Sequence, residues 1–261
     1  MTYAIRDSMT MLRRNLRRSL RYPVAPATTM GIPIVLLLLF VFVFGNTLAA
    51  GLPGASGGRD DYLDYVTPGI LLLAITGAAQ STAIAVAMDM TEGIVARFRT
   101  MAISRASVLT GHVLGSLITT LFGLAVVTGV ALALGFDATA TPLEWLGAIG
   151  LLALVTFAVT WLAVALGLVT KSVEAASNLP MPLILLPFFG SGFVPTTSMP
   201  DPLRWFADNQ PFTPIMETLR GLLMGTEIGN SGVLAVAWSV AIALGSYVWA
   251  KHLYNRDPTP V

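Results

Sequence analysis

The chain contains 261 residues, of which 55% are hydrophobic and only 11% are charged, and its formal net charge is +1. Its mean hydropathy of +0.75 excludes a soluble domain, because too few charged side chains are present to cover a core of this size. The composition is typical of an integral membrane protein. The sequence has no cysteine, which excludes disulfides, zinc–thiolate sites and cysteine nucleophiles.

Residues 1–25 predict an amphipathic helix on the inner membrane surface. Apolar side chains recur at steps of three or four residues, and arginines occupy the other faces. The apolar positions are Ile5, Met9, Leu12, Leu16 and Leu20. A topology anchor with no mechanical role is the alternative. An export signal at Arg13 and Arg14 is disfavoured, because the first apolar stretch is long enough to span and further spans follow it.

Six apolar stretches predict membrane-spanning helices, each near the ~20 residues that cross a bilayer. They cover residues 27–49, 66–88, 108–135, 145–170, 178–195 and 231–250. The fifth stretch contains four prolines, so we expect a kinked span there. The predicted fold is an all-α integral membrane protein with six transmembrane helices, forming a single domain over residues 1–261.

The lysines and arginines predict the orientation of these spans. With the N-terminus inside, twelve of the fifteen lie in inner segments, and only Arg59, Arg204 and Arg220 lie outside. Positive residues concentrate on the cytoplasmic side of membrane proteins. Both termini are therefore predicted to be cytoplasmic.

Residues 91–106 form a polar segment between the second and third spans and predict a short cytoplasmic helix. Ile94, Phe98 and Met101 share one face at helical spacing. Charged side chains occupy the other faces: Glu92, Arg97 and Arg99. A small apolar patch ringed by charge is typical of a docking surface for another protein. The alternative is a solvated loop whose arginines only enforce topology.

This segment resembles the coupling helix of type-two ATP-binding-cassette (ABC) exporter membrane subunits, and within them the daunorubicin-type drug-resistance permeases. The resemblance rests on EGIV at 92–95, RFR at 97–99 and ISR at 103–105. Ala96 and Ala102 depart from the family pattern, which commonly has an acid and a proline there. The resemblance implies that the segment inserts into a groove of a separate ATPase subunit. The implied coupling residues are Glu92, Gly93, Arg97, Phe98, Arg99, Ser104 and Arg105.

A second block resembles the family's signature after the fifth span. It reads GSGFVP at 190–195, then MP at 199–200, WF at 205–206, NQP at 209–211 and ETLRGLL at 217–223. The resemblance implies re-entrant helices in the outer leaflet over 196–226, and aromatic residues with prolines suit a membrane interface. Its marker residues are Trp205, Asn209, Glu217 and Arg220. The last two are three residues apart and predict a structural ion pair on a helix.

The chain shows no energy source of its own. Its two lysines are Lys171 and Lys251, and the TKS sequence at 170–172 lacks the glycine that a phosphate-binding loop needs. The spans carry no clear ionisable group near mid-membrane for ion coupling. We therefore expect no enzymatic activity and no cofactor bound by this chain, with ATP and Mg²⁺ on a separate ABC ATPase subunit. The resemblance implies two ATPase copies and a second permease copy, most simply a homodimer.

The predicted cargo is hydrophobic or amphipathic, because no charged cluster lines a span. The family's pathway runs between the first, second and fifth spans of two facing permeases. The candidate contacts on these spans are Phe40, Phe44, Gln80, Met181, Phe188 and Phe189. The alternative is that these side chains pack against other helices or lipid, and the Gln80 amide in particular needs a hydrogen-bonding partner.

The predicted function is a multi-pass permease of the bacterial cytoplasmic membrane that exports a drug, antibiotic or lipid-like compound, with no nucleic-acid partner. Export of a lipid-linked glycan or another lipid is the alternative within transport. A membrane channel that works without ATP is a further alternative. A lipid-modifying enzyme is disfavoured, because His112 and His252 have no triad or metal partners at useful sequence spacing.

Overall fold

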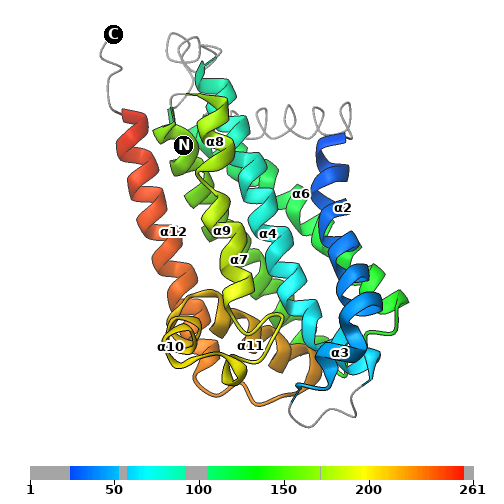
Figure 1. Ribbon diagram of the computed structural model, residues 1–261. Helices are drawn as coiled ribbons and strands as arrows, with labels where there is room; N and C mark the ends of the chain where they lie inside the picture. Colours follow the sequence, from blue (N-terminus) through cyan, green and yellow to red (C-terminus); the bar gives the residue numbers. More distant parts are fainter. Residues whose placement is uncertain (1–23, 53–57, 92–104, 171, 256–261) are drawn as a thin grey trace.

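The computed structural model of the protein describes residues 24–52, 58–91, 105–170 and 172–255 (Figure 1). Every element within these ranges is a helix, which confirms the all-α class. The predicted interfacial helix over 1–25 lies almost entirely outside them, and so do residues 92–104 of the predicted coupling helix.

Five helices in the described ranges are long and apolar enough to cross a membrane. The first is made up of three consecutive elements: α2 (Val24–Leu39), the π-helix η1 (Phe40–Phe44) and α3 (Gly45–Ala49). The others are α4 (Arg59–Thr91), α6 (Arg105–Ala133), α7 (Pro142–Val169) and α12 (Ser231–Asn255). They overlap the first, second, third, fourth and sixth predicted spans.

The fifth predicted span differs from the structure. Instead of one kinked helix over 178–195, the chain forms α8 (Val173–Asn178), α9 (Met181–Leu185) and the 3₁₀ helix η2 (Leu186–Phe189). The interruptions coincide with prolines, which lack an amide donor and clash with the preceding helical turn. Two more short helices, α10 (Asp201–Asn209) and α11 (Phe212–Met224), follow the 3₁₀ turn η3 (Thr196–Ser198).

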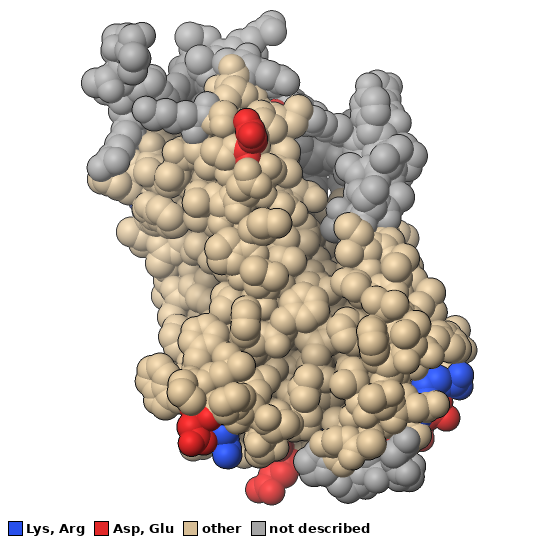
Figure 2. All heavy atoms as spheres, in the orientation of Figure 1, with Lys and Arg blue, Asp and Glu red and all other residues tan. Residues whose placement is uncertain are grey.

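The long helices run side by side between two ends of the bundle, as Figure 1 shows. We call them the α11 end, where α10, α11 and α3 gather, and the α8 end. α4 is the central helix and packs against α2, α6, α7, α8 and α11. Most of its apolar window is buried inside the protein, whereas α2, α6 and α12 leave large apolar side chains exposed. A broad uncharged band separates the charged residues on the face drawn in Figure 2, and such a surface suits contact with lipid.

Local sequence sets the start of α7. The Thr141 hydroxyl accepts from the Glu144 amide, and the Glu144 carboxylate accepts from the Thr141 amide at 2.7 Å. This capping box satisfies backbone donors that the first turn leaves free, and Pro142 has the backbone angle that a first helical residue needs. α7 then runs to Val169 along α4.

The α4–α7 contact depends on a glycine, which gives a first testable prediction. A Cβ at Gly167 would lie 2.6 Å from the Ala83 carbonyl oxygen, whereas a Cβ at Gly150 of the same helix meets nothing within 4 Å. We expect Gly167→Ala to lower the free energy of unfolding by about 2 kcal/mol, because it overpacks two backbones. Gly150→Ala should change it by less than about 1 kcal/mol. Equilibrium unfolding in detergent micelles measures both, and equal effects would contradict the close packing.

Candidate functional site

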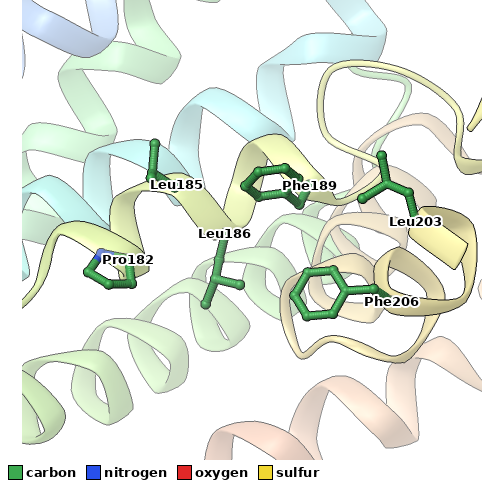
Figure 3. A pocket seen from close by; sticks show the side chains of 6 residues that line it. All are labelled: Pro182, Leu185, Leu186, Phe189, Leu203 and Phe206. Carbon is green, nitrogen blue, oxygen red and sulfur yellow. The ribbon is translucent and has the colours of Figure 1, made fainter.

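The segment formed by α8, α9 and η2 is called the broken helix below, and an apolar groove opens between it and α10 (Figure 3). Its volume is about 390 Å³. The residues that line it are Pro182, Leu185, Leu186, Phe189, Leu203 and Phe206. The Phe189 and Phe206 rings meet edge to face, with 6.4 Å between their centroids. A groove with this lining can accept an apolar or aromatic group and offers a charged group no partner.

Two local features form the walls of this groove. One wall is formed by α9 and η2. The helical segment ends at Phe189, and Gly190 continues the chain in extended conformation. The Gln210 side-chain amide donates to the Leu186 carbonyl oxygen at 3.3 Å and ties this wall to the chain after α10. The other wall is the apolar side of α10, whose opposite side carries the exposed Arg204–Asp208 ion pair. The position of α10 therefore sets the width of the groove.

The aromatic residues predicted on the cargo pathway fall into two groups. Phe40 and Phe188 both pack on Phe193, with ring centroids 4.9 and 4.5 Å away; Phe193 belongs to the buried core, and the other two rings are partly buried against it. Phe44 and Phe189 are exposed. Phe193 is almost fully buried and was missed by sequence reasoning, which treated it only as part of a motif.

The remaining pathway residues, Gln80 and Met181, lie on different helices and have different surroundings. The Gln80 side-chain amide on α4 donates to the Ser177 carbonyl oxygen on α8 at 2.6 Å, so it bonds a neighbouring helix as the alternative proposed. Met181 at the start of α9 is 56% exposed. The structure therefore brings only Phe189 of the six predicted residues into the groove.

Arg220 on α11 anchors the α11 end of the bundle. Its guanidinium donates to the Tyr65 carbonyl oxygen at 3.2 Å and to the Ser191 carbonyl oxygen at 2.9 Å. It also lies over the Tyr65 ring, 4.0 Å from the centroid. Burial lowers the pKa of Arg220, while nearby Tyr65 and Glu217 act in the opposite direction. The arginine thus joins α4, α11 and the segment after η2.

The other predicted residues of the outer helices have local roles. The predicted Glu217–Arg220 ion pair is not found between these two described residues. The Glu217 carboxylate accepts from the Ser231 hydroxyl at 2.7 Å and links α11 to α12, whereas the Arg220 guanidinium bonds carbonyl oxygens. The Asn209 side-chain amide donates to the Trp205 carbonyl oxygen at 2.7 Å and closes the end of α10. The Trp205 ring is 71% exposed, as an interfacial aromatic would be.

Comparison with known proteins assigns this architecture to a family. The sequence model of the family described as ABC-2 type transporter matches residues 7–224. The chain belongs to the ABC-2 type transporter family. Members of this family are transmembrane subunits, so the chain is a multi-pass membrane protein.

Two relatives of this ABC-2 chain confirm the narrower resemblance. It is 28% identical over 243 residues to the daunorubicin resistance ABC transporter permease protein DrrB1 of Streptomyces coeruleorubidus, covering 92% of this chain and 80% of the relative. It is 25% identical over 228 residues to a probable doxorubicin resistance ABC transporter permease protein, DrrC, of Mycobacterium tuberculosis, covering 87% and 80%. The chain therefore resembles the daunorubicin-type drug-resistance permeases.

In the described part of the ABC-2 chain, two helices flank residues 92–104, which make up most of the predicted coupling segment 91–106. α4 ends at Thr91 and α6 begins at Arg105, and these helices pack against each other. The nearby His112 does have an acidic partner, Asp89, which sequence reasoning did not find. No group of three or more metal-binding side chains occurs within residues that the structure describes. The coupling roles of residues 92–105 stay predictions.

Proposed function

We propose that the chain is the permease of an ATP-driven exporter that moves a hydrophobic or amphipathic compound out of the cell across the bacterial cytoplasmic membrane. The observation that carries this proposal is the family match over residues 7–224, which includes both sequence blocks and four of the five described apolar helices of membrane-spanning length. The bacterial sources of the relatives support the location. A separate ABC ATPase subunit supplies the energy and binds ATP and Mg²⁺.

The proposed topology has six crossings with both termini in the cytoplasm. The α8 end then faces inward and the α11 end faces outward. The fifth crossing is the broken segment Val173–Phe189, which at ~1.5 Å per residue is slightly shorter than the ~30 Å hydrocarbon core. α10 and α11 therefore lie in the outer leaflet and return the chain toward α12. The exposed tryptophan of α10 supports an interfacial position.

The proposed cargo is an amphipathic aromatic compound such as an anthracycline. The names of both relatives refer to daunorubicin or doxorubicin resistance. The groove beside Phe189 and Phe206 is lined by apolar side chains and offers aromatic faces. Phe44 and Met181 are exposed on the first and fifth apolar segments and extend the candidate cargo surface. A lipid is the second candidate cargo, because the same lining accepts an acyl chain.

The proposed assembly contains two permeases and two ATPase subunits. Coupling residues 92–105 contact the ATPase, and the second permease copy faces the broken segment. Such an assembly predicts that neither subunit confers resistance alone. The test is intracellular doxorubicin accumulation in cells that express the permease, a candidate ABC ATPase, or both. Lower accumulation only in the co-expressing cells supports the proposal, whereas equal lowering by the permease alone would indicate a channel.

The groove gives a second testable prediction. Phe189→Ala removes the ring that faces Phe206, and we expect it to lower doxorubicin efflux by the complete complex about tenfold, because hydrophobic contacts of this size are worth one to three kcal/mol. Phe122→Ala is the matched control, since Phe122 is 64% exposed on α6 and lies outside the groove. It should leave efflux unchanged. Equal efflux in the two variants would remove Phe189 from the cargo surface.

A further inference from the structure

A buried acid and histidine join α4 and α6 where these helices border residues 92–104. His112 Nε2 lies 2.9 Å from Asp89 Oδ2. The two side chains are only 11% and 5% exposed. Asp89 lies in the last turn of α4, and His112 lies in the first half of α6. The contact therefore ties together the two helices that the coupling segment connects.

The stability of α4 itself does not explain this acid. A carboxylate in the last turn of a helix faces the negative end of the helix dipole. Across the helix interface, Asp89 lies against the His112 ring, which is a favourable partner for a carboxylate. In some proteins a buried polar pair of this kind fixes how two elements are placed relative to each other.

The pair adjoins a close-packed cluster that reaches four of the long helices. Val86 of α4 and Val113 of α6 belong to this cluster. Its other buried members come from the same end of α6, from α7 and from α12: Leu109, Trp161, Val164, Ala165, Ala250 and Tyr254. Close-packed interiors transmit displacement because they have little free volume. A movement of the joined α4 and α6 ends would therefore displace α7 and α12 as well.

A second polar contact on the same helix interface lies deeper in the bundle. The Thr82 and Ser116 hydroxyls are 2.7 Å apart. This contact is neutral, and Thr82 also donates to the Ala78 carbonyl oxygen in its own helix. It lies farther along both helices from residues 92–104 than the Asp89–His112 pair. The two contacts therefore offer a matched comparison on one interface.

We propose that Asp89 and His112 are positioning residues that hold the α4 and α6 ends together, so that a push from the ATPase moves both helices as one body. This inference rests on the proposed function, because it assumes that the ATPase acts on residues 92–105. Without the pair, the push would separate the two helix ends instead of shifting the bundle. ATP hydrolysis would then continue with little transport.

The absence of cysteine from the whole chain makes a direct test possible. Asp89→Cys with His112→Cys removes the pair, and a short bifunctional thiol reagent, applied before the ATPase is added, restores a link. The reconstituted complex is then assayed for co-elution, ATP hydrolysis and doxorubicin transport. We expect transport per ATP to be about tenfold below native without the link and within about twofold of native with it. Co-elution should be native in both states.

The control is Thr82→Cys with Ser116→Cys, for which transport per ATP should stay near native with and without the link. The positioning role is overturned if the Asp89→Cys, His112→Cys protein transports normally without the link, if linking does not restore transport, or if the two cysteines do not link. A native complex that neither co-elutes with the ATPase nor transports doxorubicin means instead that the proposed function fails, and the inference fails with it.

Discussion

Reversal of two charges in the coupling segment, Arg97→Glu with Arg99→Glu, should abolish binding of the ATPase subunit. In the predicted coupling helix the two arginines lie beside the apolar face that is expected to dock. Glutamates in their place would repel a partner surface that the native arginines attract. We expect affinity for the ATPase to fall at least about a hundredfold. Co-elution of the two subunits in mild detergent measures this loss.

The control for this variant is Lys251→Glu, which reverses a charge near the end of α12, at the end of the bundle where α4 ends and α6 begins. It should leave co-elution intact. The double variant should still insert into the membrane and elute as a folded protein. Loss of insertion would show instead that Arg97 and Arg99 act as topology anchors, which is the alternative reading of this segment.

Removal of the buried guanidinium at the α11 end should strongly destabilise the fold. Arg220→Met replaces the arginine with an apolar side chain of similar length. It removes two hydrogen bonds to carbonyl oxygens and the contact of the guanidinium with the Tyr65 ring. Hydrogen bonds from a charged donor contribute about 1.5–3 kcal/mol each and are not strictly additive. We expect the free energy of unfolding to fall by about 3 kcal/mol.

The matched control is Arg204→Met on α10. Arg204 is exposed and forms an ion pair with Asp208 at 3.6 Å, one helical turn away. Exposed pairs of this kind contribute between zero and about 1 kcal/mol. Equilibrium unfolding of the two variants in the same detergent gives the comparison. If they were equally stable, the three segments joined at Arg220 would be held by apolar packing alone.

The long helices were predictable from the sequence because their apolar runs are uncharged and near the ~20 residues of a span. The path of the fifth stretch was only partly predictable. Pro182 and Pro187 indicated a bend, but the end of the helical segment at Phe189 also depends on distant contacts. One of these is the bond from Gln210 to the Leu186 carbonyl oxygen, 24 positions away.

The partners of the polar residues were harder to predict for the same reason. Arg220 is three residues from Glu217, so local spacing favoured an ion pair, yet its carbonyl acceptors lie 155 and 29 positions away. His112 is 23 positions from Asp89. Helical periodicity reports neighbours on one helix, whereas these contacts form between helices and depend on the packing of the whole bundle.

Doxorubicin uptake into inside-out proteoliposomes tests the central claim most directly. The purified permease is reconstituted alone, with the candidate ABC ATPase, and with that ATPase carrying a substitution that prevents ATP hydrolysis. The account predicts uptake only when the permease, the active ATPase, ATP and Mg²⁺ are all present. Uptake by the permease alone, at a rate that ATP does not change, would contradict an exporter driven by a separate subunit.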